Sequence, residues 1–187
     1  MELIDAIYNR RAVRSYTGKH IDQPIILKLI DAAVRAPSAV NQQPWAFAVI
    51  RETDELSRIS REARRHILEA VPADSPMARF KQHVADPGFD LLYGAPVLIV
   101  IYATTTESGA CEDCALAAEN LMLAARALGL GSCWIGLARP WLSQAESKQE
   151  LGIEPHYTPV APIVVGYPTT WPDAPGRNEP EIHWIGA

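Results

Sequence analysis

Helical and extended patterns of apolar residues alternate along the chain. Helical spacing of apolar residues predicts helices over 2–9, 22–36, 54–71, 112–128 and 140–151. Continuous apolar runs predict strands over 46–50, 96–102, 130–136 and 159–167. The run 96–102 consists almost entirely of β-branched residues, which is typical of a strand buried on both faces. Many alanines in 112–128 predict a helix that packs closely, with Gly129 as its C-terminal cap.

Two segments lack such periodicity. Residues 72–92 are interrupted by prolines and a glycine, and we expect a mobile or substrate-covering segment there. From residue 168 onward, prolines and acidic residues surround the isolated Arg177. This tail cannot pack on itself, so we expect it to extend over another surface.

The connection between the second predicted helix and the first strand is dense in hydrogen-bonding groups. Pro37 and Pro44 fix its two ends, and Ser38, Asn41, Gln42 and Gln43 lie between them. A preorganised ligand-binding loop has this composition. An ordinary capped connection between a helix and a strand remains an equally good explanation of the residues alone.

Composition excludes several classes of protein. The 187 residues are 48% hydrophobic and 21% charged, as in ordinary globular domains. A net charge of −5 argues against general nucleic-acid binding. No apolar run approaches the roughly 20 residues of a membrane span, and the acidic amphipathic N-terminus is unlike a signal peptide. We therefore expect a cytoplasmic protein with neither a nucleic-acid nor a membrane partner.

Two motifs that could carry chemistry are incomplete. Cys111 and Cys114 form a C-x-x-C, but no second ligand pair would complete a zinc site, and no thioredoxin-like strand precedes them. Three cysteines also fit a reducing compartment better than a disulfide framework. Gly129 and Gly131 lack the third glycine of a dinucleotide-binding fingerprint. We predict no metal site and assign these cysteines to packing.

Three arginines cluster near the N-terminus. Arg10, Arg11 and Arg14 occupy five residues that favour an extended backbone, so their guanidinium groups repel one another unless an anion or carboxylates lie between them. A solvated basic turn paired with acidic residues is the alternative.

The chain resembles the FMN-dependent nitroreductase family. The matching motifs are R-R-A-V-R-S-Y at 10–16, A-P-S-A-V-N-Q-Q-P-W at 36–45, E-N-L-M-L-A-A-R-A-L-G-L-G-S-C-W-I-G at 119–136, and V-G-Y-P followed by Arg177. They stand in the family's order and span nearly the whole chain. The resemblance implies a single α+β domain over 1–187, with a central mixed sheet flanked by helices. It also implies an intertwined homodimer whose tail, 168–187, wraps the partner subunit.

The same resemblance implies the roles of individual residues in binding FMN. Arg10, Arg11 and Arg177 would hold the phosphate and ribityl region, and Arg14 would lie nearer the pyrimidine edge of the ring. From the other subunit, the flavin would be reached by Pro37, Ser38 and Ala39, with Asn41 matching the same motif. Backbone groups of Trp134, Ile135 and Gly136 would line the ring. Ala12 departs from the Ser of many members and removes one hydroxyl contact.

The implied activity is a ping-pong oxidoreductase. NAD(P)H would transfer a hydride to the flavin and leave, and an electron-poor acceptor such as a nitroaromatic or a quinone would then take the electrons. Because the cofactor carries out this chemistry, no catalytic side chain is assigned. Two alternatives remain: a dedicated dehydrogenase, enoate reductase or reductive dehalogenase of the same fold, and a non-catalytic flavin-binding dimer.

Overall fold

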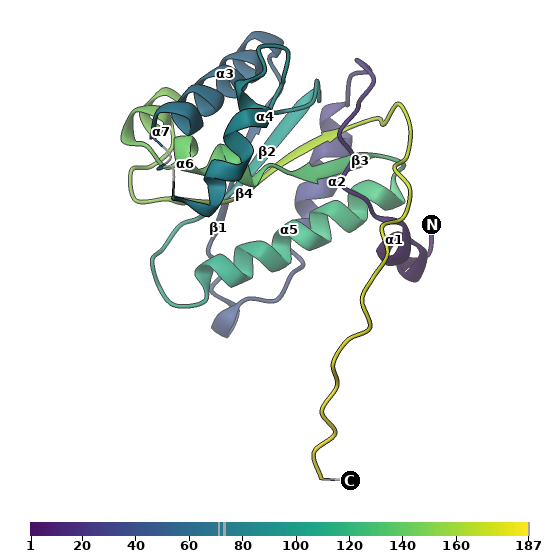
Figure 1. The fold of residues 1–187 in the computed structure, drawn as a ribbon. Helices are drawn as coiled ribbons and strands as arrows, with labels where there is room; N and C mark the ends of the chain where they lie inside the picture. The colour runs from purple at the N-terminus through teal and green to yellow at the C-terminus, as the bar shows by residue number, and fades with distance from the viewer. Residues whose placement is uncertain (71, 73, 187) are drawn as a thin grey trace.

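A sheet of four antiparallel strands forms the centre of the computed structural model, which describes residues 1–70, 72 and 74–186 (Figure 1). Its strands are β1 (Trp45–Ile50), β2 (Val97–Ala103), β3 (Gly131–Trp134) and β4 (Thr158–Gly166). They lie in the order β1-β2-β4-β3, and each hydrogen-bonded pair is antiparallel. A single parallel bridge between Ala12 and Ser132 adds the N-terminal segment beside β3 and makes the pairing mixed.

The central strand β2 is buried on both faces, as its sequence predicts. Ile99 and Ile101 belong to one apolar cluster, and Leu98 and Val100 belong to another on the opposite face. Because successive side chains of a strand point to opposite faces, a continuous apolar run supplies two cores at once.

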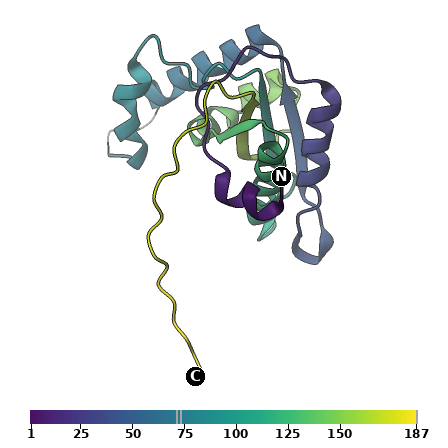
Figure 2. The same ribbon diagram turned by 90° about the vertical axis from the view of Figure 1, so that its right-hand side faces the viewer.

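Helices cover both faces of the sheet (Figures 1 and 2). One face packs against α2 (Gln23–Ala33) and α5 (Ala110–Ala127), and α1 (Leu3–Asn9) lies against α5. The other face packs against α3 (Thr53–Ala70) and α6 (Arg139–Leu142). The helices α4 (Lys81–Ala85) and α7 (Ala145–Glu150) adjoin that second layer. This arrangement confirms the predicted α+β fold with a sheet flanked by helices.

Small side chains let α5 approach its neighbours closely. Cys114, Ala117, Ala118 and Ala125 are fully buried between this helix, the sheet and α2. Gly129 follows the helix with a φ of +76°, the left-handed conformation that glycine adopts without steric cost. The predicted central helix and its glycine cap are both confirmed.

The predicted helix over 140–151 is interrupted in the structure. It forms as α6 and α7, separated at Gln144, whose ψ of 147° is extended. The Ser147 hydroxyl donates to the carbonyl oxygens of Trp141 (2.6 Å) and Gln144 (2.9 Å) and so competes with a continuous helical ladder. Residue 71, the predicted end of another helix, lies outside the described residues.

The two aperiodic segments differ from each other. Between α3 and β2, the chain forms a short 3-10 helix, η2 (Pro76–Phe80), and then α4. The C-terminal tail instead leaves the body of the molecule as an extended strand-like segment (Figure 2). Every described residue from 169 to 186 is exposed in this single chain.

Candidate functional site

The basic segment 10–16 is fixed beside β3. The Val13 amide donates to the Ser132 carbonyl at 3.0 Å, and the Tyr16 hydroxyl donates to the Val13 carbonyl at 2.7 Å. Val13 is fully buried, and a Cβ on Gly131 would lie only 2.7 Å from it, so the glycine permits the close approach. Anchoring Val13 inward leaves Arg14 exposed on the outside.

The beginning of the tail is held against the same segment. Thr17 donates from its amide to the Tyr167 carbonyl at 2.8 Å, and the Thr169 amide donates to the Ser15 carbonyl at 3.1 Å. The Arg126 guanidinium lies 3.7 Å from the ring centroid of Trp171, a close cation–π contact. These contacts direct the following residues over the N-terminal arginines.

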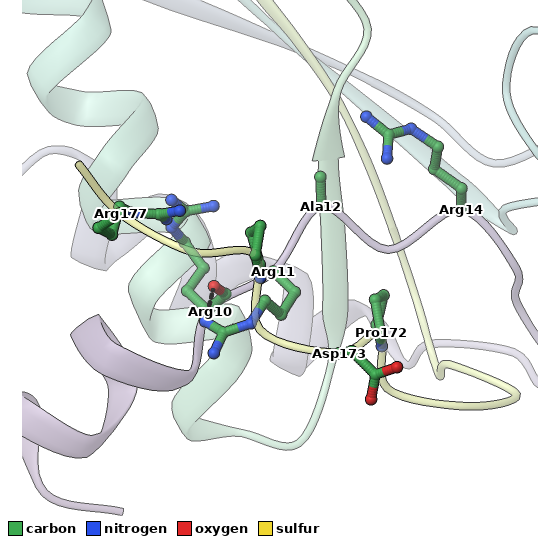
Figure 3. A pocket seen from close by; sticks show the side chains of 8 residues that line it. Arg10, Arg11, Ala12, Arg14, Pro172, Asp173 and Arg177 are labelled. Carbon is green, nitrogen blue, oxygen red and sulfur yellow. Dashed lines mark hydrogen bonds between the residues drawn. The ribbon is translucent and has the colours of Figure 1, made fainter.

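A basic cavity of about 380 Å³ forms where the tail crosses this segment (Figure 3). It is lined by Arg10, Arg11, Ala12, Arg14, Pro172, Asp173, Pro175 and Arg177. Four guanidinium groups therefore face one carboxylate in the lining. In Figure 3, Arg14 lies on one side of Ala12, at one end of the cavity, and Arg10 and Arg177 lie at the other end. Such an excess of positive charge is suited to a multiply charged anion.

The arginines are partly engaged by the protein. Arg10 pairs with Glu119 at 3.2 Å, and Arg11 donates to the carbonyl oxygens of Tyr8 and Arg10, both at 2.7 Å. Arg177 donates to the Gly176 carbonyl at 3.3 Å. The bonds of Arg11 and Arg177 go to neutral carbonyls, so their charge is not neutralised by them.

A second cavity of about 580 Å³ is mainly apolar and aromatic. It is lined by Arg14, Phe80, His83, Phe89, Leu91, Tyr93, Cys133, Trp134, Ile135, Gly136 and Leu137. The rings of His83 and Phe89 lie 4.4 Å apart, and those of Phe89 and Tyr93 lie 5.8 Å apart. Arg14 lines both cavities, so its side chain lies between a basic cavity and an apolar one.

Two ionisable groups in the second cavity stay neutral at physiological pH. Burial raises the pKa of Tyr93 and the pKa of Cys133, and in each case the positive charge of Arg14 opposes the shift. Neither side chain therefore offers a negative charge, and Arg14 carries a positive charge to the edge of the apolar cavity.

The structure brings seven of the predicted site residues together and leaves four elsewhere. The arginines 10, 11, 14 and 177 share the first cavity, and residues 134–136 line the second. Pro37, Ser38, Ala39 and Asn41 line neither of these cavities and lie beside the start of α5 (Figure 1). In the single chain, these four residues therefore do not share a cavity with the other seven.

The loop that carries these four residues is rigidly held. Asp113, buried in the first turn of α5, accepts from the Ala39 amide at 3.1 Å. The Ser38 hydroxyl accepts from the Gln43 amide at 2.9 Å. Val40, Asn41 and Gln43 have φ values of +44°, +58° and +51°, so the loop is fixed in an uncommon conformation. Such geometry agrees with a preorganised binding loop.

Several lining residues were missed by the sequence analysis. Phe80, His83 and Phe89 come from the segment 72–92, for which only mobility or a covering role was expected, and Tyr93 follows it directly. Their aromatic side chains within 14 positions were the available signal, because rings gathered in an aperiodic segment often line a pocket.

The C-x-x-C cysteines lie by the loop and outside both cavities. Cys114 is fully buried and donates from Sγ to the Pro44 carbonyl at 3.6 Å. Burial, with smaller contributions from Cys111 and Asp113, raises the pKa of Cys114 to about 12. Since the thiolate is the reactive form, Cys114 is inert and helps to pack the loop.

Comparisons with known proteins agree with the fold. A protein of Methanothermobacter thermautotrophicus with a provisional NADH dehydrogenase/NAD(P)H nitroreductase name is 30% identical over 188 residues, covering 98% of this chain and 86% of its own. Among solved structures, a nitroreductase with bound FMN from Desulfitobacterium hafniense has a TM-score of 0.83 at 22% identity, covering 99% of each chain. An FMN-dependent nitroreductase from Clostridium difficile has a TM-score of 0.75 at 26% identity, and the match covers 100% of this chain and 98% of the nitroreductase chain.

Among the helices of the described residues, none combines the length and the apolar character that a membrane span requires.

The model of the nitroreductase family matches residues 7–167, which include the sheet, both helical layers and most of the site. The chain belongs to the nitroreductase family.

Proposed function

We propose that this protein is an FMN-dependent oxidoreductase that carries electrons from NAD(P)H to an electron-poor acceptor such as a nitroaromatic or a quinone. Family membership and the similarity, at 26% identity, to an FMN-dependent nitroreductase of known structure support the flavin-dependent activity. The observation that carries the proposal is the pair of adjoining cavities with Arg14 in both linings. One cavity suits a dianionic headgroup and the other a flat ring.

The residues of the first cavity fit the phosphate of FMN. A flavin phosphate carries close to two negative charges, and guanidinium groups bind such oxygens through paired, charge-assisted hydrogen bonds. Arg10, Arg11 and Arg177 would hold this group. Ala12 places only a methyl group in the lining.

The residues of the second cavity fit the ring. Trp134, Ile135 and Gly136 would line it, and the aromatic residues of 80–93 would exclude water from it. When bound, FMN supplies the redox chemistry, receiving a hydride from NAD(P)H and passing electrons to the acceptor. The protein would orient the reactants, and Arg14 would hold a positive charge near the edge of the ring, where it favours the reduced state.

The activity predicts a direct spectroscopic result. The purified protein should show the visible absorption of a flavin, lose it on anaerobic addition of NADH or NADPH, and regain it when a nitroaromatic or a quinone is added. Bleaching without recovery on any acceptor would point to a dedicated enzyme of the same fold. A protein that binds no FMN when the cofactor is supplied would contradict the proposal.

A homodimer would complete this site. In the single chain, α1 and the tail expose large apolar side chains, with Ile4 59%, Tyr8 73%, Trp184 82% and Ile185 96% exposed. Apolar surface of this kind favours burial against another chain. A second copy would bring Pro37, Ser38, Ala39 and Asn41 to the cofactor, and the tail over 168–187 would wrap its partner.

Sedimentation equilibrium tests this assembly. The wild-type protein should sediment at twice the chain mass, and Ile4→Glu should shift the equilibrium toward the monomer, because a charge would be placed in the apolar contact. Leu68→Glu is the matched control, since Leu68 is also partly exposed but lies on α3 in the opposite layer. A monomeric wild-type protein would contradict the dimer.

A further inference from the structure

Tyr93 has an unusual backbone conformation at the edge of the second cavity. Its φ is +58°, in the left-handed region that residues with a side chain rarely adopt, and Gly94 follows with a φ of +67°. A bulky residue in this region is strained, whereas Gly or Asn would fit with less strain. The presence of a tyrosine therefore suggests that its side chain is needed there.

A network around Asp90 holds this turn in place. One carboxylate oxygen of Asp90 accepts from the Leu92 amide at 3.0 Å and from the Ser60 hydroxyl at 2.7 Å. The other accepts from the Gly94 amide at 2.6 Å. Ser60 is only 5% exposed, and its hydroxyl accepts from the Leu91 amide at 2.9 Å. With so many bonds fixing the turn, the strained conformation at its centre can persist.

The turn directs the Tyr93 ring toward Arg14. The ring stands edge-on to Phe89, with an angle of 83° between the two planes, which fixes its orientation in the wall. The Arg14 guanidinium carbon lies 6.0 Å from the Tyr93 ring centroid. Arg14 is exposed and extends from a segment whose neighbouring Val13 is anchored, so its side chain depends on such a contact for a fixed position.

We propose that Tyr93 is a positioning residue that holds the Arg14 guanidinium at the junction of the two cavities. The inference rests on the proposed function, because the junction matters only when a cofactor spans it. A cation near the ring stabilises the reduced cofactor, which carries more negative charge than the oxidised form. Tyr93 would thus set the preference of the site for reduced over oxidised FMN by fixing where that cation lies.

A double-mutant cycle tests this role. The ratio of dissociation constants for oxidised and reduced FMN is measured anaerobically for the wild type, Arg14→Ala, Tyr93→Ala and the double variant. Arg14→Ala should lower the preference for the reduced form by about tenfold, as expected for a lost contact to a charged group. Tyr93→Ala should lower it by about threefold in the wild type and leave it unchanged when Arg14 is absent.

Two further variants keep the result interpretable. Tyr157→Ala is the matched control, because Tyr157 is also half-buried but lines neither cavity, and it should not change the ratio. If Tyr93→Ala does not fold, Tyr93→Leu enters the same cycle, since it removes the aromatic ring and keeps an apolar side chain in the wall. An effect of either Tyr93 variant that persists without Arg14, or no effect in the wild type, would overturn the inference. Failure of the wild type to bind FMN would instead overturn the proposed function.

Discussion

Replacing Arg177 with alanine is expected to weaken FMN binding by about 10- to 100-fold. Arg177 lines the basic cavity from the tail, and within the described residues its guanidinium donates one hydrogen bond, to the carbonyl of the preceding glycine. Hydrogen bonds to charged groups contribute about 1.5–3 kcal/mol, which corresponds to that range of affinity. Quenching of flavin fluorescence on titration with the apoprotein measures the dissociation constant.

Arg35→Ala provides the matched control for this experiment. Arg35 is an exposed arginine paired with Asp31 one helical turn away, and it lines neither cavity. Its loss removes the same charge and should leave FMN affinity unchanged. Equal weakening by both variants would indicate a general electrostatic effect and would contradict a specific role for Arg177.

Replacing Gly131 with alanine is expected to lower both stability and FMN affinity. The added Cβ would lie 2.7–2.9 Å from three side-chain carbons of Val13, which is fully buried. Overpacking of this kind costs about 1–3 kcal/mol. Relief requires the segment to move away from β3, and Arg11 and Arg14 would move with it. Thermal unfolding and the same flavin titration measure the two effects.

Two variants separate this effect from a general sensitivity to alanine. Gly18→Ala introduces a Cβ with no heavy atom within 4 Å and should change neither quantity. Val13→Gly in the Gly131→Ala background removes all three of these carbons and should restore part of the lost FMN affinity. If Gly131→Ala binds FMN as tightly as the wild type, the position of the arginines does not depend on this contact.

The sheet and its helices could be predicted because their patterns are local. The apolar run over β2 predicts a strand buried on both faces, and the alanines of α5 predict a closely packed helix. Each prediction depends only on the spacing of residues within one element, and the structure confirms both. The break at Gln144 could not be predicted, because it depends on the hydroxyl of Ser147 competing for backbone carbonyls.

Candidate site residues could be predicted only where the type of side chain, such as a charged guanidinium group, indicates what it binds. Clustered arginines favour an anion or paired carboxylates, and the resemblance then made Arg10 and Arg14 candidate residues for the phosphate and the ring. The wall containing Tyr93 depends instead on a turn fixed by Asp90 and Ser60, which are 30 positions apart. Contacts between distant residues leave no periodic signal in the sequence, so this wall required the structure.

The basic cavity also has a consequence for how the protein is made. Its walls come from residues 10–14 and residues 172–177, which are at opposite ends of the chain. While a ribosome is still synthesising the protein, the first wall has emerged and the second does not yet exist. If this cavity holds FMN as proposed, loading would follow completion of the polypeptide, and a product terminated before Arg177 is expected to retain FMN poorly.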